Sequence, residues 1–328
     1  MRKMIKDLLN HDPEITVVGT AVDGIDALNK IRMLSPHVVT LDVNMPKMDG
    51  LTTLQKIMEE NPLPVIMVSS LTTEGAEATL KALDCGAVDY VAKPSGEISL
   101  DIEKIRNTLI EKIKMAAKAN VVIHKPVSPL SLSLTQLDNV ILIGASTGGP
   151  PAIEKILSCL PAVVPPILIV QHMPSGFTKS FANRLNKHCK FEVKEAEEGD
   201  SIQPSLALVA PGGYHMIVGK DKRVHLDSSP PLHGVRPAVD PMMMTAAEVF
   251  GDKTIGVLLT GMGRDGAWGM KAVKQHGGYT IVQDKKSCVV FGMPKAAIEE
   301  GCVDEILPLH KIPRRLIRLC GFPLKYLL

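Results

Sequence analysis

The feature that most constrains this chain is a repeated alternation of short apolar segments with amphipathic helical segments. Parallel strands that are covered by helices on both faces read as continuous apolar runs. The pattern therefore predicts α/β architecture with parallel sheets. In the first 95 residues the predicted strands are 15–22, 37–43, 64–70 and 88–92, and the predicted helices are 1–9, 25–34, 51–58 and 74–84.

The alternation stops once and then resumes. Residues 119–137 lose the helical periodicity and gain Pro and Ser, which is typical of a linker. We therefore predict a first domain over 1–118 that ends in a helix through 102–113, a linker over 119–137, and a second α/β domain over 138–328. Strand and turn signals between 190 and 227 leave room for an antiparallel part. Strands are predicted in the second domain at 139–143, 165–171, 206–211, 254–261 and 279–283.

Composition narrows the class of protein. A length of 328 residues fits two domains, at about 100–200 residues per domain. The net charge of +2 and the aromatic content of 3% argue against nucleic-acid binding. The sequence has neither a signal peptide nor an apolar run of about 20 residues, so we expect a cytoplasmic protein without membrane insertion. The six cysteines form no C-x-x-C pair, and we expect buried free thiols rather than zinc ligands or disulfides.

Three polar side chains end or follow successive predicted strands of the first domain. Asp42 and Ser69 lie at the ends of 37–43 and 64–70, and Lys93 follows 88–92. The carboxyl ends of parallel strands meet at one sheet edge, where ligands bind. A carboxylate, a hydroxyl and an ammonium group at one edge suit a carboxylate that accepts a phosphoryl group. The alternative is that each residue is a solvated strand end, with Asp42 as a turn former.

The segments LDVNMPKMDG, PVIMVSS and VDYVAKPS resemble response-regulator receiver domains over about residues 1–118. The resemblance implies a flavodoxin-like fold with Asp42 as the phospho-acceptor and Ser69 as the switch hydroxyl. It also implies Lys93 as the phosphate-sensing lysine and Tyr90 as the rotameric aromatic residue. Asn44 is implied as a Mg²⁺ ligand through its backbone carbonyl, and a chemotaxis histidine kinase as the phosphodonor.

One part of the receiver pattern has no counterpart here. Receivers begin with a strand that ends in a Mg²⁺-binding acidic pair, whereas this sequence begins at the helix that follows. In the flavodoxin-like order 2-1-3-4-5 that strand is central. Because Mg²⁺ prefers six oxygen ligands, we expect Asp42 and Asn44 to bind it only weakly. Either the sequence is clipped or this receiver is impaired. The alternative is that Asp49 or Asp23 replaces the acidic pair.

A glycine-rich turn follows the first strand of the second domain, with the sequence Gly144-Ala145-Ser146-Thr147-Gly148-Gly149-Pro150. It fails the dinucleotide fingerprint because Ser146 stands at the second glycine, and it fails the P-loop because Pro150 and Pro151 replace Lys and Ser/Thr. The turn instead exposes one serine hydroxyl at a helix N-terminus, where N–H groups can stabilise an oxyanion. The alternative is that Ser146 caps its helix.

Two further polar residues follow strands of the same predicted sheet. His172 follows 165–171, and Asp265 follows 254–261. Together with Ser146 they match the arrangement that a nucleophile, a general base and an orienting carboxylate require. The alternatives are a structural hydrogen-bonding role for His172 and a helix N-cap for Asp265.

Four nearby residues are weaker candidates. His215 and His233 compete with His172 as the base, but neither follows a buried strand as clearly. Asp240 precedes Pro241 and is expected to be an N-cap with Pro at the first helical position. Arg236 is expected either at the mouth of the site or in a surface ion pair.

The second half resembles the catalytic domain of the chemotaxis protein-glutamate methylesterase (CheB) family in the segments IGASTGGP, VQHMPSGFT, APGGYHM, RPAVDP, LTGMGRDGAWGM and QDKKSCVVFGMPKAAI. The resemblance implies Ser146 as nucleophile, His172 as general base and Asp265 as its orienting carboxylate. It implies the backbone N–H groups of Met262 and Thr147 as oxyanion-hole donors.

The implied activity is hydrolysis of glutamate methyl esters on chemoreceptors, with deamidation of receptor glutamines, no cofactor for catalysis and control by receiver phosphorylation. The alternative function is a non-enzymatic, receiver-controlled α/β binding module that uses the glycine-rich turn.

Overall fold

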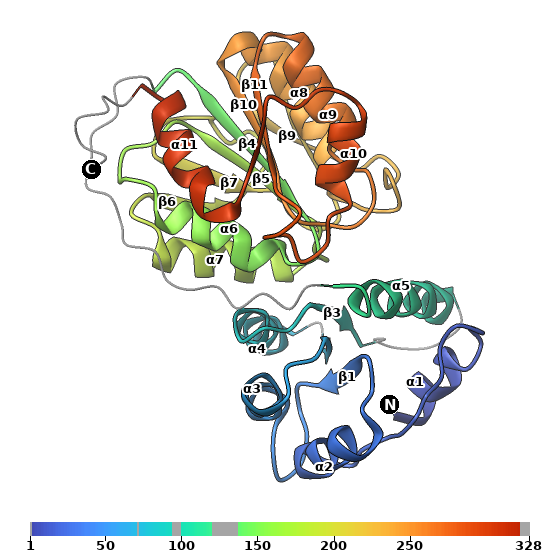
Figure 1. Cartoon of the computed structure of the whole chain (residues 1–328). Helices are drawn as coiled ribbons and strands as arrows, with labels where there is room; N and C mark the ends of the chain where they lie inside the picture. Colours follow the sequence, from blue (N-terminus) through green and yellow to red (C-terminus); the bar gives the residue numbers. More distant parts are fainter. Residues whose placement is uncertain (1, 71, 94–99, 120–136, 322–328) are drawn as a thin grey trace. The chain divides into compact units, whose positions relative to one another are not determined.

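The computed structural model describes residues 2–70, 72–93, 100–119 and 137–321. The chain divides into two compact units, Met1–Ile123 and His124–Leu328, and each has its own parallel sheet (Figure 1). Within the described residues, no helix is long and apolar enough to cross a membrane.

The described part of the first unit contains a parallel sheet with the order β1-β2-β3. This order matches the 3-4-5 part of the flavodoxin-like order. The register pairs Asp42 with Val68 and Ser69 with Ala92, so the strands end at one edge. The elements are α1 (Arg2–Leu9), α2 (Gly24–Leu34), β1 (Val39–Asp42), α3 (Gly50–Glu60), β2 (Val65–Ser69), α4 (Thr73–Asp84), β3 (Asp89–Ala92) and α5 (Leu100–Ala116).

The strand predicted over 15–22 is wrong. This segment is described, but it pairs with no strand, and Val18 and Val22 are about half exposed. An extended segment becomes a strand only when a neighbouring strand takes its backbone hydrogen bonds. Side chains take them here instead. Arg2 donates to the carbonyl of Ala21 (2.9 Å), Lys30 donates to that of Thr20 (2.6 Å), and Asp26 accepts the Val22 N–H (2.9 Å).

The second unit is built on a sheet whose described strands are all parallel, in the order β12-β11-β10-β4-β5-β7-β6. The chain leaves β4 for β5 on one side and later adds β10 on the other side, so the strand order reverses at β4 and its carboxyl end is the place where open α/β sheets bind ligands. The strands are β4 (Val140–Ala145), β5 (Ile167–Gln171), β6 (Glu192–Glu195), β7 (Leu206–Val209), β10 (Thr254–Leu258), β11 (Tyr279–Gln283) and β12 (Glu305–Leu307).

Helices cover both faces of this sheet, as the sequence predicts (Figure 1). One face carries α6 (Gly149–Ser158), α7 (Phe177–His188) and α11 (Ile312–Leu319), and the other carries α8 (Val239–Phe250), α9 (Ala267–Gln275) and α10 (Met293–Glu299). Short 3₁₀ turns η1 (Gly251–Lys253) and η2 (Leu309–Lys311) precede β10 and α11. Val140 and Leu142 of β4 pack in one fully buried cluster with Val239 and Met242 of α8. Burial of each such side chain contributes about 1.5–3 kcal/mol, which fixes α8 against the sheet.

The segment 190–227 does contain an antiparallel part. It contributes β6 and β7 to the parallel sheet, and then forms a separate antiparallel pair of β8 (His215–Val218) and β9 (Val224–Asp227). The cysteines are free thiols, four of them buried and two partly buried. Burial raises the pKa of the Cys288 thiol to about 12, which makes it a poor nucleophile.

Candidate active site

Ser146 follows the central strand β4, and hydrogen bonds hold its backbone on both sides. Its N–H donates to the carbonyl of Thr260 after β10 (3.0 Å), and its carbonyl accepts the N–H of Gly149 (2.8 Å). The N-cap of α6 is Gly148, so the alternative that Ser146 caps this helix is wrong. The serine side chain is partly exposed at the carboxyl edge of the sheet.

The position opposite Ser146 tolerates no side chain. A Cβ atom at Gly261 would lie 2.8 Å from Cβ of Ser146 and 2.2 Å from Sδ of Met293. Real Cβ atoms do not approach other heavy atoms so closely. Glycine at this position therefore lets the loop after β10 lie directly against the serine.

His172 lies beside Ser146 because β4 and β5 are in parallel register. The last pair of that register is Ala145 with Gln171, and the His172 N–H donates to the carbonyl of Ala145 (3.2 Å). Nε2 of Gln171 donates to the carbonyls of Ser146 (3.0 Å) and His172 (3.3 Å). Sequence reasoning missed Gln171. The feature that could have revealed Gln171 is that it is a single polar residue at the end of the apolar run ILIVQ, where it is buried.

Nε2 of His172 lies 2.7 Å from Oδ2 of Asp265, and the side chains are 11% and 2% exposed. Backbone N–H groups hold the rest of the Asp265 carboxylate. Val239 donates to Oδ2 (2.7 Å), and Asp240 and Gly266 donate to Oδ1 (3.0 and 2.9 Å). Gly266 is the N-cap of α9, so the alternative N-cap role for Asp265 is wrong.

These contacts keep Asp265 ionised. Burial alone raises the pKa of the carboxyl, but the hydrogen bond and charge of His172, with the N–H groups of Val239 and Asp240, outweigh it and hold the Asp265 pKa below its ordinary value. A buried anion hydrogen-bonded to one imidazole nitrogen fixes the tautomer and the ring orientation. With Nε2 engaged, Nδ1 is the nitrogen that remains for Ser146. The structure contains no hydrogen bond between Ser146 Oγ and His172, a bond that is often long before substrate binds.

The peptide between Gly261 and Met262 is oriented by its carbonyl. The carbonyl of Gly261 accepts the N–H groups of Gly292 and Met293, both at 3.0 Å. The C=O and N–H of a trans peptide point in opposite directions, so the Met262 N–H points away from these donors. It has no acceptor among the described residues. Thr147 is buried, and its carbonyl accepts the hydroxyl of Thr260 (2.9 Å).

The weaker candidates have other partners. His215 is buried, with Nδ1 accepting the N–H of Ala238 (3.1 Å) and Nε2 near the carbonyl of Pro230 (3.2 Å), so it has a structural role. Arg236 donates to the carbonyls of Ser228 and Ser229, and within the described part of the chain it forms no ion pair.

The N-cap prediction for Asp240 is wrong. Ala238 caps α8, and Asp240 lies in the first turn with its side chain bonded to Gly269 (2.7 Å) and His233 (2.9 Å). A carboxylate that points across to α9 cannot turn back to cap its own helix.

In the first unit, the predicted edge residues come together. Nζ of Lys93 lies 2.8 Å from Oδ1 of Asp42, and both side chains are partly exposed. The Lys93 N–H donates to the carbonyl of Ser69 (2.6 Å), which joins the ends of β2 and β3. The Asn44 N–H donates to Oδ1 of Asp42 (3.0 Å).

Ser69 and Tyr90 are buried below this edge. Oγ of Ser69 donates to the carbonyl of Gly75 (2.9 Å) in α4, which directs the hydroxyl toward that helix. Burial, and then the charge of Asp89, raise the pKa of Tyr90 well above its ordinary value. Lys112 of α5 lies 5.1 Å from the centre of its ring.

Comparison with known proteins gives the same division of the chain. Residues 141–316 match the family model for CheB methylesterase, and residues 1–105 match that for the response regulator receiver domain. Both matches confirm the resemblances seen in the sequence.

Full-length relatives are also similar. A protein-glutamate methylesterase/protein-glutamine glutaminase of Pyrococcus abyssi is 50% identical, over 97% of this chain and 90% of the relative. One of Symbiobacterium thermophilum is 48% identical over 98% and 94%. The crystal structure of the Thermotoga maritima CheB methylesterase catalytic domain is 46% identical, with a TM-score of 0.54, and covers 59% of this chain and 100% of its own. The chain therefore belongs to the CheB methylesterase family and carries a response-regulator receiver domain.

Proposed function

We propose that this protein is a protein-glutamate methylesterase and that Ser146, His172 and Asp265 perform the hydrolysis. One observation carries the proposal: a histidine bound to a buried, ionised carboxylate lies next to a serine at the carboxyl end of the central strand. The names of the full-length relatives support the same substrate chemistry. We infer no cofactor for this reaction, since a nucleophile, a base and an oxyanion hole suffice.

In the proposed reaction, Oγ of Ser146 attacks the carbonyl carbon of a γ-glutamyl methyl ester while Nδ1 of His172 takes the hydroxyl proton. The N–H groups of Met262 and Thr147 hold the oxyanion of the tetrahedral intermediate. The C–O bond to the methoxy group then breaks, and methanol leaves with the proton from His172. Water attacks the acyl-enzyme with His172 again as base, and glutamate and free Ser146 are restored. Asp265 remains ionised and stabilises the imidazolium throughout.

The same route deamidates glutamine. An amide nitrogen takes the place of the methoxy oxygen, accepts the proton from His172 and leaves as ammonia. Amides are the poorer substrates because nitrogen is a poorer leaving group than oxygen. We therefore propose glutaminase as a side activity, in agreement with the names of the relatives.

We propose Asp42 as the phosphorylation site of the receiver, with Lys93, Ser69 and Tyr90 as the residues that respond to the phosphoryl group. The Lys93–Asp42 ion pair supports this, because the ammonium group already lies where phosphate oxygens would need a positive charge. The domain limits we propose are 1–118 for the receiver, 119–137 for the linker and 138–328 for the methylesterase.

Receivers use Mg²⁺ for phosphorylation, and the described residues around Asp42 fit only part of such a site. Asp42 and the carbonyl of Asn44 are suitable oxygen ligands. Asp23 instead binds Lys47 (2.7 Å) and caps α2, and Asp49 caps α3, so neither carboxylate is available as a replacement ligand. Within the described ranges, no cluster of three metal-ligating side chains includes Asp42.

The partners we propose are methyl-accepting chemoreceptors as substrates and a chemotaxis histidine kinase as phosphodonor. Both the receptor region that carries the methyl esters and the kinase are cytoplasmic in such systems. We therefore place the protein in the cytoplasm.

The test is methanol release from methylated receptor by the wild type and by Ser146→Ala and His172→Ala variants. Loss of the nucleophile or the base costs on the order of 10⁶ in kcat in another serine hydrolase, so both variants should be inactive. A serine-directed acylating reagent should label Ser146 above all other serines. Substantial methanol release by Ser146→Ala would refute the nucleophile assignment, and absence of selective labelling would favour a binding module.

A further inference from the structure

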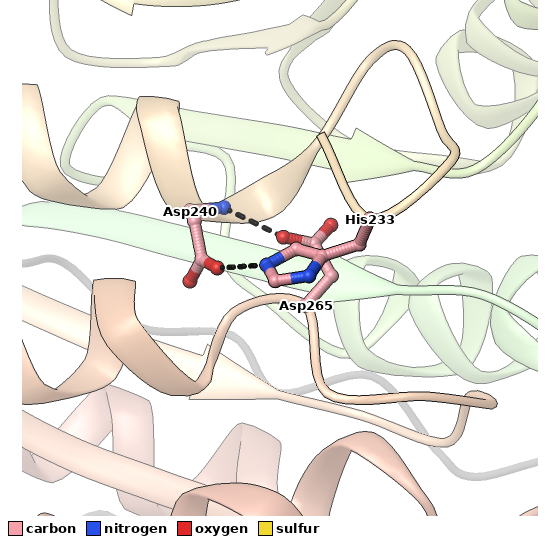
Figure 2. Close-up of side chains that lie close together, drawn as sticks. All are labelled: His233, Asp240 and Asp265. Atoms are coloured by element: carbon pink, nitrogen blue, oxygen red, sulfur yellow. Dashed lines mark hydrogen bonds and ion pairs between the residues drawn. The ribbon is translucent and has the colours of Figure 1, made fainter. Parts of the chain in front are cut away.

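A second buried carboxylate lies beside the proposed triad and takes no part in the proposed proton transfers. The Asp240 side chain is 0% exposed in the first turn of α8. Its Oδ1 accepts the N–H of Gly269 in α9 (2.7 Å), and its Oδ2 lies 2.9 Å from Nε2 of His233 (Figure 2). Both carboxylate oxygens are therefore engaged, although the residue is remote from the ester in the proposed mechanism.

The backbone of Asp240 connects this side chain to the triad. Its N–H donates to Oδ1 of Asp265 (3.0 Å; Figure 2). The preceding N–H, of Val239, donates to Oδ2 (2.7 Å). The first turn of α8 thus orients the Asp265 carboxylate. The Asp240 side chain in turn ties that turn to α9, which begins directly after Asp265 and Gly266. Movement of Asp240 would therefore change the position of Asp265.

A metal site is the other reading of this cluster. His233, Asp240 and Asp265 each offer a ligand atom, and these atoms lie within 4.8 Å of one another. The hydrogen bonds argue against it. Asp265 already accepts three backbone N–H groups and binds His172. A cation there would have to displace the contacts that fix the triad, whereas a positioning role uses all of them.

The charges of the two buried carboxylates explain why His233 lies beside Asp240. Two carboxylates are buried close together, and burial first, then the charge of Asp265, raise the pKa of Asp240. The backbone N–H of Gly269, and then the hydrogen bond and charge of His233, oppose both effects on the Asp240 pKa. Among the described residues, His172 is bound to Asp265, and Arg264 lies over the ring of Trp268, which packs against His233.

We propose that His233 and Asp240 form a positioning pair: His233 holds the Asp240 side chain in place, and Asp240 fixes the first turn of α8 and thereby the Asp265 carboxylate toward His172. The pair deepens the proposed esterase function and rests on it. Neither residue touches the substrate.

The test compares Asp240→Asn, His233→Ala and His233→Gln in the full chain. Loss of one well-placed hydrogen bond of about 1.4 kcal/mol corresponds to a tenfold change in rate, so Asp240→Asn and His233→Ala should lower kcat about tenfold with little change in KM. His233→Gln should stay within about threefold of the wild type, because its amide N–H₂ can donate from the place of Nε2. The matched control is His225→Gln, since His225 forms a similar pair with Glu198 (2.6 Å) on the β8–β9 hairpin.

Two further measurements separate positioning from folding. If Asp265 is no longer held toward His172, its carboxylate stabilises the imidazolium less, so the acid limb of the pH profile of kcat/KM should move to lower pH in Asp240→Asn and His233→Ala and stay in place in His233→Gln. Because His233→Ala keeps the Asp240 carboxylate, a shift in that variant reports the position of Asp265 and not the loss of a charge. Trp268 is the single tryptophan and its ring centre lies 5.0 Å from that of His233, so an unchanged emission maximum shows that the local packing is retained.

Wild-type kcat and an unmoved acid limb in both Asp240→Asn and His233→Ala would overturn the proposal. Loss of activity with a red-shifted Trp268 emission and an unmoved limb would overturn it too. If the wild type hydrolyses no ester, the proposed function fails, and NMR titration of the His172 ring still decides the pairing. A lower titration midpoint in His233→Ala, which keeps the Asp240 carboxylate, supports the positioning pair, and an unchanged midpoint refutes it.

Discussion

Replacement of Asp265 by Asn tests the proposed triad at its most constrained residue. The carboxylate binds His172 and three backbone N–H groups, and an amide presents only one oxygen. If the new NH₂ group took the place of Oδ1, it would face the N–H groups of Asp240 and Gly266. If it took the place of Oδ2, it would face one backbone N–H, that of Val239, and the histidine ring. The second orientation is favoured because it leaves fewer donors unsatisfied.

That orientation changes the histidine. The side-chain amide of the Asp265→Asn variant would donate to Nε2 of His172, the ring proton would move to Nδ1, and Nδ1 could no longer accept the proton of Ser146. The wrong tautomer costs about 10⁴ in kcat in a serine protease, so we expect a loss of about 10³–10⁴ here. One unsatisfied backbone N–H costs about 1–3 kcal/mol of stability. The variant should thus remain folded, with weak but measurable activity.

The assay is methanol release from methylated receptor, together with thermal denaturation of each variant. The matched control is Asp304→Asn. Asp304 also accepts a backbone N–H, that of Thr280 (3.0 Å), and pairs with Lys274, but it precedes β12 at the opposite edge of the parallel sheet. Asp304→Asn should lose stability and keep kcat. If Asp265→Asn retained kcat within tenfold of the wild type, the tautomer argument would be wrong.

Three further predictions concern the two domains. Residues 138–328 alone should fold and hydrolyse ester at or above the rate of the full chain, because every residue proposed for hydrolysis lies in the second unit; a folded but inactive segment would contradict this. A small phosphodonor should label Asp42 in the wild type and should not label the Asp42→Asn variant, because the Lys93 ammonium group lies 2.8 Å from the Asp42 carboxylate where phosphate oxygens need a positive charge; equal labelling of the two proteins would refute Asp42 as the phospho-acceptor. The contacts that lower the Asp265 pKa stabilise the folded state at pH values above 3.8, the ordinary pKa of the group. This stabilisation is lost as the pH falls below 3.8 through the folded-state pKa. Acid unfolding of the isolated second domain should therefore lack this pH-dependent component in Asp265→Asn.

One rule was enough to group the three residues of the proposed triad. Residues that follow neighbouring parallel strands share an edge, and Ser146, His172 and Asp265 each follow a strand that lies at or beside β4. The rule also grouped Asp42, Ser69 and Lys93 correctly. It needs only strand positions, which the apolar runs give clearly.

The predictions that were wrong concern segments whose local structure is decided by a contact with a residue far away in the sequence. Asp240 before Pro241 has the local signal of an N-cap, but its side chain reaches Gly269, 29 positions away, and Ala238 becomes the cap. Residues 15–22 have the apolar alternation of a strand, but side chains of α1 and α2 take their backbone hydrogen bonds. Local sequence patterns contain neither of these tertiary contacts.

The placement of β4 between β5 and β10 has a consequence for the order of folding. Ser146 and His172 follow consecutive strands, but Asp265 follows β10, which pairs with the other side of β4, and it lies 93 positions after His172 in the sequence. Contacts between residues so distant in sequence form late, because the entropy of loop closure must be overcome first. A refolding chain should recover its secondary structure before its esterase activity. The recovery of activity therefore reports when β10 docks beside β4, which is the step that completes the sheet around its central strand.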